Sequence, residues 1–356
     1  MGRMFDGATN FDQPLDSWNV SKVTDMSYMF SYAIRFNQPL DSWNVSQVTD
    51  ISFMFDNATN FNQSLKSWNV SKVTDMGYMF ANTASFNQPL TVWNVSQVTD
   101  MSGMFQEATN FNQPIDSWDV SKVTDMSGMF DNAISFNQSL DSWDVSKVTD
   151  MNGMFDNAIS FNQPLDSWDV SKVISMAEMF AGATSFNQPL NSWDVSQVTD
   201  MNSMFDNATS FNQLLDSSDV SQVTDMRDMF ADISLSISNY DKLLLGWSTL
   251  PNLQYNVVFD AGNSHYSATA QHAREKLIKN FGWNITDGGL SENSFLTTLG
   301  ISTLFFIVLI GVIGVSAVVS VTYFGHKKMK NGKLKKDLKF LNYFKNIVFK
   351  HKKIAN

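Results

Sequence analysis

The sequence predicts an α/β solenoid of short strands and short helices, closed by a C-terminal cap and followed by a single transmembrane helix. Three observations support this fold class. A unit of 25 residues recurs along most of the chain, strand and helix periodicities alternate inside each unit, and one long apolar stretch follows the repeats. A fixed period of this length is typical of solenoids, in which each repeat packs on its neighbours because it cannot bury its apolar face alone.

The repeated unit reads F-N-Q-P-L-D-S-W-[ND]-V-S-[KQ]-V-T-D-M-x-x-M-F-x-x-A-x-x. Its nine copies fill residues 11–235 and begin at Phe11, Phe36, Phe61, Phe86, Phe111, Phe136, Phe161, Phe186 and Phe211. Residues 1–10 match the end of a unit, since Met4 falls 25 residues before Met29. We therefore expect a partial repeat at residues 1–10 and an incomplete N-terminus.

Two periodicities alternate inside the unit. In the second copy, the apolar residues of the second half share the spacing of one face of a short helix: Val48, Ile51, Met54, Phe55 and Ala58. Thr49 and Asp50 stand where an N-cap residue and a first-turn acid belong. In the first half, Trp43 and Val45 alternate with polar residues, which predicts a short strand. Stacked copies are expected to pair these strands in a parallel ladder, about 4.8 Å per coil.

A tryptophan recurs once in each unit and is predicted to lie in the structural core. It stands at Trp18, Trp43, Trp68, Trp93, Trp118, Trp143, Trp168 and Trp193. Ser218 replaces it in the ninth copy, and a terminal repeat is expected to be atypical.

Residues 236–289 break the repeat and are predicted to cap it. We expect a helix over Tyr240–Trp247, a strand from Leu253 to Phe259, and helical spacing from Ser267 to Phe281. Such a segment would cover the apolar face of the last coil.

The C-terminal part predicts a membrane anchor. After a linker at residues 290–298, the apolar residues 299–323 are long enough to cross a bilayer, with a buried core helix as the alternative. The basic tail, residues 324–356, is then cytoplasmic and the repeats are extracytoplasmic. The expected partners are therefore a membrane, spanned once, and a second copy that pairs weakly through this helix.

Charge and composition exclude several functions. Residues 327–353 carry 11 Lys and one Asp, which leaves 13 basic and 34 acidic residues elsewhere, a net charge near −21. So acidic a body argues against nucleic-acid binding. There is no Cys, the four His are scattered, and neither a nucleophile elbow nor a phosphate-binding glycine loop occurs. We expect no enzymatic activity, no cofactor and no firm metal site.

One repeated position suggests a weak cation or partner site. Positions are counted from the Phe that begins each unit. Position nine is Asn in the first four copies and Asp in the last five, at Asp119, Asp144, Asp169, Asp194 and Asp219. Stacked about 4.8 Å apart, these charges repel, and a divalent cation or basic ligand would relieve the repulsion. The alternative is that Lys122, Lys147 and Lys172, three residues downstream of three of them, already do so.

The unit F-N-Q-P-L-x-x-W-[ND]-V-S-x-V-T-x-M-x-x-M-F resembles the repeat of BspA-like leucine-rich-repeat surface proteins, which is also abundant in mycoplasma surface lipoproteins. The resemblance covers residues 1–235. It implies a leucine-rich-repeat-like solenoid and a cell-surface protein that adheres to partners without catalysis. The anchor departs from the family, because there is neither a Cys for lipid attachment nor an L-P-x-T-G signal.

The predicted function is a membrane-anchored surface adhesin or protein-binding scaffold, with a protein or surface glycan as ligand. The alternative is a structural coat or spacer without a specific ligand. Uniform repeats favour the spacer, whereas a binding patch should leave variation along the exposed residues. The variation at Lys66, Thr91 and Val92 is slight.

Overall fold

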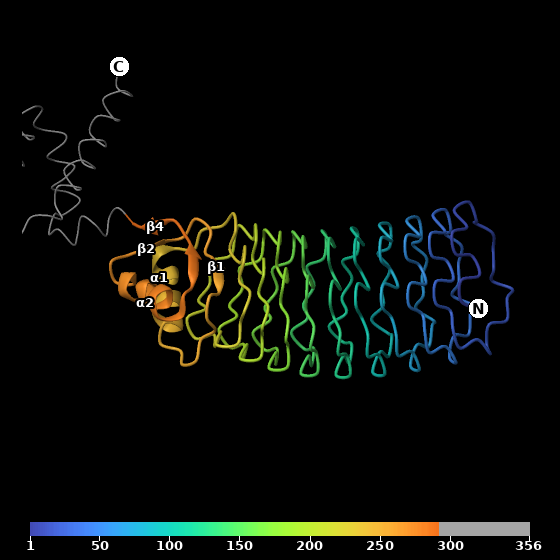
Figure 1. The fold of residues 1–356 in the computed structure, drawn as a ribbon. Coiled ribbons are helices and arrows are strands. Elements are labelled where there is room, and N and C mark those ends of the chain that lie inside the picture. The colour runs from blue at the N-terminus through green and yellow to red at the C-terminus, as the bar shows by residue number, and fades with distance from the viewer. Residues whose placement is uncertain (292–356) are drawn as a thin grey trace, which may run out of the picture. The chain divides into compact units, whose positions relative to one another are not determined.

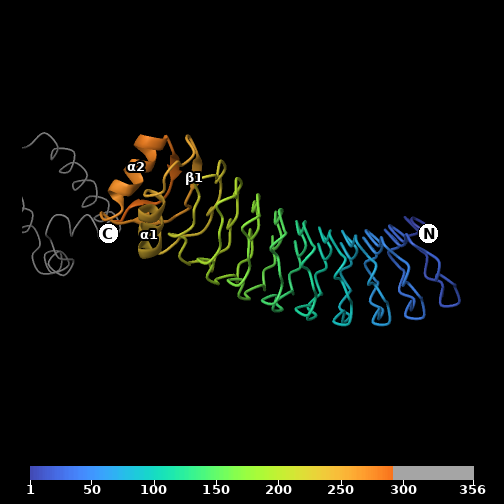
Figure 2. The same cartoon turned by 90° about the horizontal axis from the view of Figure 1, so that it is seen from below.

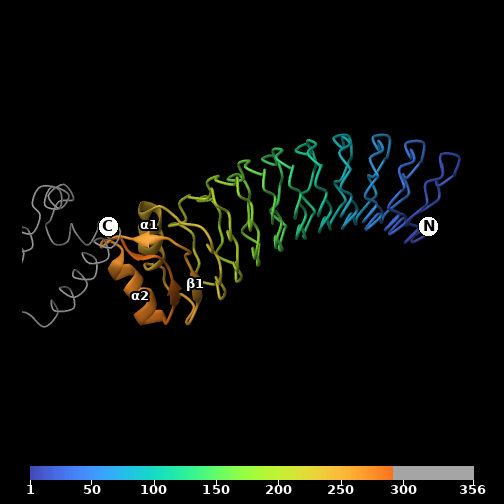
Figure 3. The ribbon, with the colours of Figure 1, turned by 90° about the horizontal axis from the view of Figure 1, so that it is seen from above.

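The computed structural model describes residues 1–291. Each 25-residue repeat makes one coil, and consecutive coils lie side by side from the N-terminus to the cap (Figure 1). The same stacking is visible from below and from above (Figures 2 and 3). We number the coils one to nine, so that coil one is residues 11–35 and coil nine is residues 211–235.

The coils contain no helix, so the predicted α/β solenoid of short strands and helices is wrong. In coil two the residues expected to be helical form successive turns instead, closed by bonds from Met54 N–H to Ile51 C=O and from Ala58 N–H to Phe55 C=O. Alternate N–H groups, such as that of Phe55, donate to the next coil. In a helix, the N–H groups of the interior donate to carbonyls of the same helix. In these successive turns, every second N–H group remains available to donate to a neighbouring coil.

The parallel pairing of coils lies at position fifteen and not at the predicted Trp43–Val45 strand. Single-residue parallel bridges join Asp25 to Asp50, Asp50 to Asp75, and so on to Asp225. Residues 43–45 form no strand. Their alternation arises because Trp43 and Val45 point into the core between two turns.

The interior is a set of identical side-chain columns. Phe30 stacks on Phe36 with ring centroids 4.0 Å apart, and on Phe55 of the next coil at 5.6 Å. From Trp43 to Trp193, each indole N–H donates to a leucine or isoleucine carbonyl in the preceding coil, as Trp43 does to Leu15 at 2.9 Å. At position two, the Asn37 side-chain oxygen accepts the N–H of Asn62 and the side-chain amide of Gln63. These bonds hold each coil in register with the next.

The segment after the coils carries all the regular elements of the described chain. Their bounds are α1 Ile237–Trp247, β1 Val258–Asp260, β2 His265–Tyr266, α2 Gln271–Phe281, β3 Asn284–Thr286 and β4 Gly289–Leu290. Strand β1 pairs in parallel with β3, and β2 with β4. A bridge from Met226 to Phe259 joins coil nine to β1. The Asp287 carboxylate, almost fully buried, binds Arg274 at 2.7 Å and accepts a hydrogen bond from the Tyr240 hydroxyl at 2.8 Å.

Within residues 1–291, neither of the helices is long and apolar enough to cross a membrane. The predicted span at 299–323 and the tail at 324–356 lie outside the described residues. The structure gives no support to a membrane partner, to a dimer through such a helix, or to the extracytoplasmic and cytoplasmic placement derived from it. These predictions are corrected accordingly and are not retained.

Candidate binding face

The bridged part of every coil, positions fourteen to eighteen, forms one surface, which we call the bridge face; position sixteen points into the core and the other four positions line the surface. Position fourteen is an exposed threonine column, in which Thr49 N–H and hydroxyl both donate to the Thr24 carbonyl. The pattern repeats to Thr224, with Ile174 as the one replacement. The hydroxyl protons are thus used between coils, and the column is ordered by the fold itself.

Position fifteen forms a column of aspartates, which we call the Asp column. Its members are Asp25, Asp50, Asp75, Asp100, Asp125, Asp150, Asp200 and Asp225, with Ser175 in coil seven. The Asp50 Oδ1 atom accepts the N–H and the hydroxyl of Ser52, at 2.9 and 2.7 Å. Among residues 1–291, the Asp75 carboxylate accepts a hydrogen bond only from the Gly77 N–H. Burial, with the charges of Asp100 and Asp50, raises the pKa of this carboxyl. The column is therefore a line of carboxylates held at one-coil spacing.

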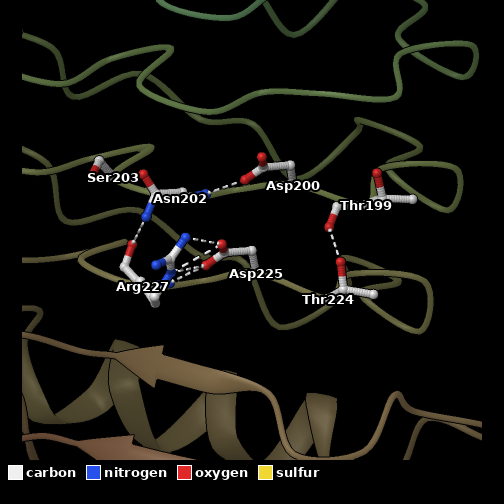
Figure 4. A network of polar contacts seen from close by, with 7 residues as sticks. All are labelled: Thr199, Asp200, Asn202, Ser203, Thr224, Asp225 and Arg227. Carbon is white, nitrogen blue, oxygen red and sulfur yellow. Dashed lines mark hydrogen bonds and ion pairs between the residues drawn. The ribbon is translucent and has the colours of Figure 1, made fainter.

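At the capped end of the Asp column, the chain supplies a guanidinium (Figure 4). Arg227 binds both carboxylate oxygens of Asp225, with Nε 3.0 Å from each and a terminal nitrogen 2.6 Å from Oδ2. The Arg227 N–H still donates to Asp225 Oδ1. These bonds lower the pKa of Asp225. An aspartate of the Asp column can therefore accept its backbone N–H bond and bind a guanidinium through both carboxylate oxygens at the same time.

Position eighteen has one backbone conformation and changing side chains. Every residue of this column has a positive φ, from 53° at Ser203 to 60° at Arg3 and Gly128. In order the column reads Arg3, Tyr28, Phe53, Tyr78, Gly103, Gly128, Gly153, Glu178, Ser203 and Asp228. Glycine adopts this conformation freely, whereas a residue with a Cβ atom is strained by about 1–2 kcal/mol. The column is thus aromatic in coils one to three, glycine in four to six and polar in seven to nine.

The three aromatic residues stack on one another, and we call them the aromatic column. The Tyr28 and Phe53 centroids are 4.5 Å apart, those of Phe53 and Tyr78 are 4.7 Å apart, and the planes are within 8° of parallel. Arg3 places its guanidinium 3.9 Å from the Tyr28 centroid. At the other end, a Cβ on Gly103 would lie 2.3 Å from the Tyr78 ring. The rings are half-buried, so a ridge of ring edges remains at the surface.

Beyond the aromatic column, aspartates at position twenty-one lie beside the glycines of the bridge face. A Cβ on Gly128 or Gly153 would meet only an aspartate Cβ, at 4.0 or 3.8 Å. Burial, together with the charges of Asp131 and Glu178, raises the pKa of Asp156 to about 7. The three-coil segments therefore differ in shape as well as in charge.

A family described as "Mycoplasma protein of unknown function, DUF285" matches the chain three times in tandem, over residues 1–92, 63–151 and 138–242. The chain belongs to this family. No curated protein matches the chain. The DUF285 matches identify a repeat protein, while the narrower resemblance to BspA-like leucine-rich repeats stays a prediction.

In the DUF285 repeats, the predicted carboxylate ladder at position nine closes local turns. Asp119, Asp144, Asp169, Asp194 and Asp219 each accept, at 3.0–3.1 Å, the N–H of the serine two residues on. Asn44 and Asn69 make the same bond, which explains why Asn and Asp exchange here. Bonds from Ser121, and then the charge of Lys122, lower the pKa of Asp119. Across residues 1–291 no cluster of His, Asp or Glu is arranged to hold a metal ion, and the cation hypothesis for this ladder stays a prediction.

The repeated tryptophans lie where coil meets coil, with one exception at each end. From Trp43 to Trp193 they are 3–5% exposed, whereas Trp18 in coil one is 36% exposed. Ser218 leaves a space of about 20 Å³ near Leu190 and Met204. Trp247 of α1 donates its indole N–H to Leu215 at 3.0 Å, continuing the tryptophan column into the cap.

Sequence reasoning missed the bridge face because it assigned positions fourteen to eighteen to a helix. Two signals pointed to turns. Glycine recurs at position eighteen in coils four to six, and asparagine recurs four residues later, at Asn57, Asn82, Asn132, Asn157 and Asn207. Both residue types are favoured where φ is positive, which no helix interior requires.

Proposed function

We propose that the chain is an adhesin-type, protein-binding scaffold that engages its partners through the bridge face. One observation carries this proposal: position eighteen changes in blocks of three coils while the interior columns stay the same. A spacer needs only an interior that holds the coils together. Glycine, which adopts the backbone conformation of position eighteen without strain, would then suffice in every coil. Positions seventeen, twenty-one and twenty-two also vary from coil to coil. Variation at surface positions above an unchanged interior is what a binding surface requires.

The regular geometry also suits a scaffold. Bonds between coils fix the threonine column, and bonds from the residue two positions on fix the aspartate carboxylates. A partner therefore meets side chains that are already ordered, and little conformational freedom is lost on binding. The resemblance to BspA-like surface proteins supports an adhesive role. We propose binding and not catalysis, with the uniform-spacer function as the competing candidate.

Panning a displayed peptide library on the full chain, followed by hydrogen exchange of the complex, tests the proposal. We expect enriched peptides that protect backbone amides at positions fourteen to eighteen. A variant with Thr74→Arg and Thr99→Arg should lose the enriched peptides, whereas Asn44→Arg with Asn69→Arg, on a different exposed column, should keep them. Absence of enrichment, or protection confined to other columns, would favour the spacer.

A further inference from the structure

The aromatic column is the least expected feature of the bridge face. Tyr28, Phe53 and Tyr78 hold the same left-handed conformation as Gly128 and Gly153, at φ values of 55–60°. Bulky residues rarely adopt this conformation, and the chain itself shows that glycine serves the same position three coils later. Strain that the fold does not require points to a function at the strained residues.

The carboxylates beside the aromatic column have bonding capacity left. Asp50, Asp75 and Asp100 accept their local hydrogen bonds through Oδ1. Between residues 1 and 291, no hydrogen bond reaches their Oδ2 atoms. The charges of the Asp column reach the Tyr78 hydroxyl. Burial, and then the charges of Asp125 and Asp100, raise the pKa of this hydroxyl. An apolar ridge and a line of half-satisfied carboxylates therefore share one surface.

The chain contains two examples of the group that fits this surface, and both are guanidinium groups. Arg227 forks onto Asp225 of the same Asp column without displacing its backbone bond. Arg3 lies on the outer ring of the aromatic column, 3.9 Å from the Tyr28 centroid. In coils one to six, positions fourteen to eighteen hold no basic residue of their own. The free carboxylates of these coils thus lack the partner that Asp225 has.

We propose that the aromatic column, with Asp25, Asp50, Asp75 and Asp100, binds an arginine-bearing segment of a partner protein. This inference rests on the proposed function and names the chemistry of its ligand. Charge complementarity supports a basic occupant, since the chain outside residues 327–353 carries 34 acidic and 13 basic residues.

Arginine fits this surface better than lysine for a geometric reason. Its apolar stem packs along the exposed ring edges while the planar fork reaches the open Oδ2 atoms, as Arg227 does at Asp225. A lysine ammonium is a compact point charge and cannot make two parallel bonds to one carboxylate. The site should therefore discriminate between two peptides of equal charge.

Fluorescence anisotropy with the full chain tests the proposal. The probes are a labelled peptide of alternating arginine and serine and its lysine counterpart. We expect the arginine peptide to bind at least about tenfold more tightly. Replacing Tyr28, Phe53 and Tyr78 together by Gly should weaken arginine binding by about tenfold or more, with an unchanged circular dichroism spectrum, because glycine accepts this backbone.

Matched variants separate this site from general charge attraction. Asp50→Asn with Asp75→Asn should weaken arginine binding, whereas Asp125→Asn with Asp150→Asn, which removes the same charge from the glycine coils, should change it less than about twofold. Equal binding of the two peptides, equal effects of the two aspartate pairs, or preference for an uncharged proline-rich peptide would overturn the proposal. Library peptides that still bind the bridge face in that event would leave the proposed function standing.

Discussion

Coils one to three and coils seven to nine share an interior and differ on the bridge face. In both regions the phenylalanine and methionine columns repeat with the same contacts, and the tryptophan column is buried except at its two ends, where Trp18 is 36% exposed and Ser218 replaces the tryptophan. Position eighteen, however, is Tyr28, Phe53 and Tyr78 in the first region and Glu178, Ser203 and Asp228 in the second. The interior determines the fold of a coil, and side chains on the bridge face can therefore change while the fold stays the same.

If the interiors are equivalent, removing one tryptophan should cost the same in either region. We expect Trp68→Ala and Trp168→Ala each to lower the free energy of unfolding by about 3–5 kcal/mol, because both indoles are 3% exposed and both leave a cavity. Denaturant unfolding of the two variants measures this. Trp18→Ala, at 36% exposure, is the control and should cost about 1–2 kcal/mol. Unequal costs at Trp68 and Trp168 would contradict the equivalence.

Asp156, which lies beside the bridge face at position twenty-one, should make stability depend on pH. The folded protein holds the Asp156 proton more tightly than the unfolded chain, because its pKa is raised from an ordinary value of 3.8 to about 7. The stabilising contribution is full below about pH 4 and is lost as the pH rises to about 7.

We therefore expect Asp156→Asn to stabilise the protein at pH 7 by about 1–2 kcal/mol, after screening by solvent, and to have little effect at pH 4. Melting temperatures across this range measure it. Asp131→Asn should give a smaller gain, because the charge of Asp131 is a lesser cause of the shift than burial. A gain at pH 4 as large as that at pH 7 would contradict the assignment.

Removing a single ring from the aromatic column should change stability little. Phe53→Gly loses stacking with Tyr28 and Tyr78 but relieves a strained backbone, so we expect a net change within about 1 kcal/mol. Chemical denaturation measures this change. A loss above about 3 kcal/mol would mean that the aromatic residues serve the fold and would remove the argument from strain.

The smallest effect is expected at position nine. Asp144→Asn with Asp169→Asn keeps the oxygen that accepts the serine N–H, so we expect the stability to change by less than about 0.5 kcal/mol. The melting temperature should be compared with and without calcium. A loss seen only with calcium would show that these carboxylates bind a cation in addition to closing turns.

The sequence allowed the period, the identity of the core columns and the approximate positions of α1 and α2 to be predicted, because periodicity reports which side chains are buried. It did not distinguish a helix from successive turns. The spacing of Val48, Ile51, Met54 and Phe55 fits either, and the choice depends on bonds to the next coil. The bridge face was missed for the same reason, since its columns exist only once coils are stacked in register.

Moving the aromatic column along the stack tests the central claim most directly. The moved variant removes the original rings by Tyr28→Gly, Phe53→Gly and Tyr78→Gly. It adds three rings by Gly103→Tyr, Gly128→Phe and Gly153→Tyr, beside Asp100, Asp125 and Asp150. The measurement is affinity for the arginine peptide, with hydrogen exchange to locate the bound segment. We expect binding to be lost with the three glycine substitutions alone and to return in the moved variant, with protection shifted to coils four to six. Unchanged binding by the glycine variant, or no recovery in a folded moved variant, would contradict it.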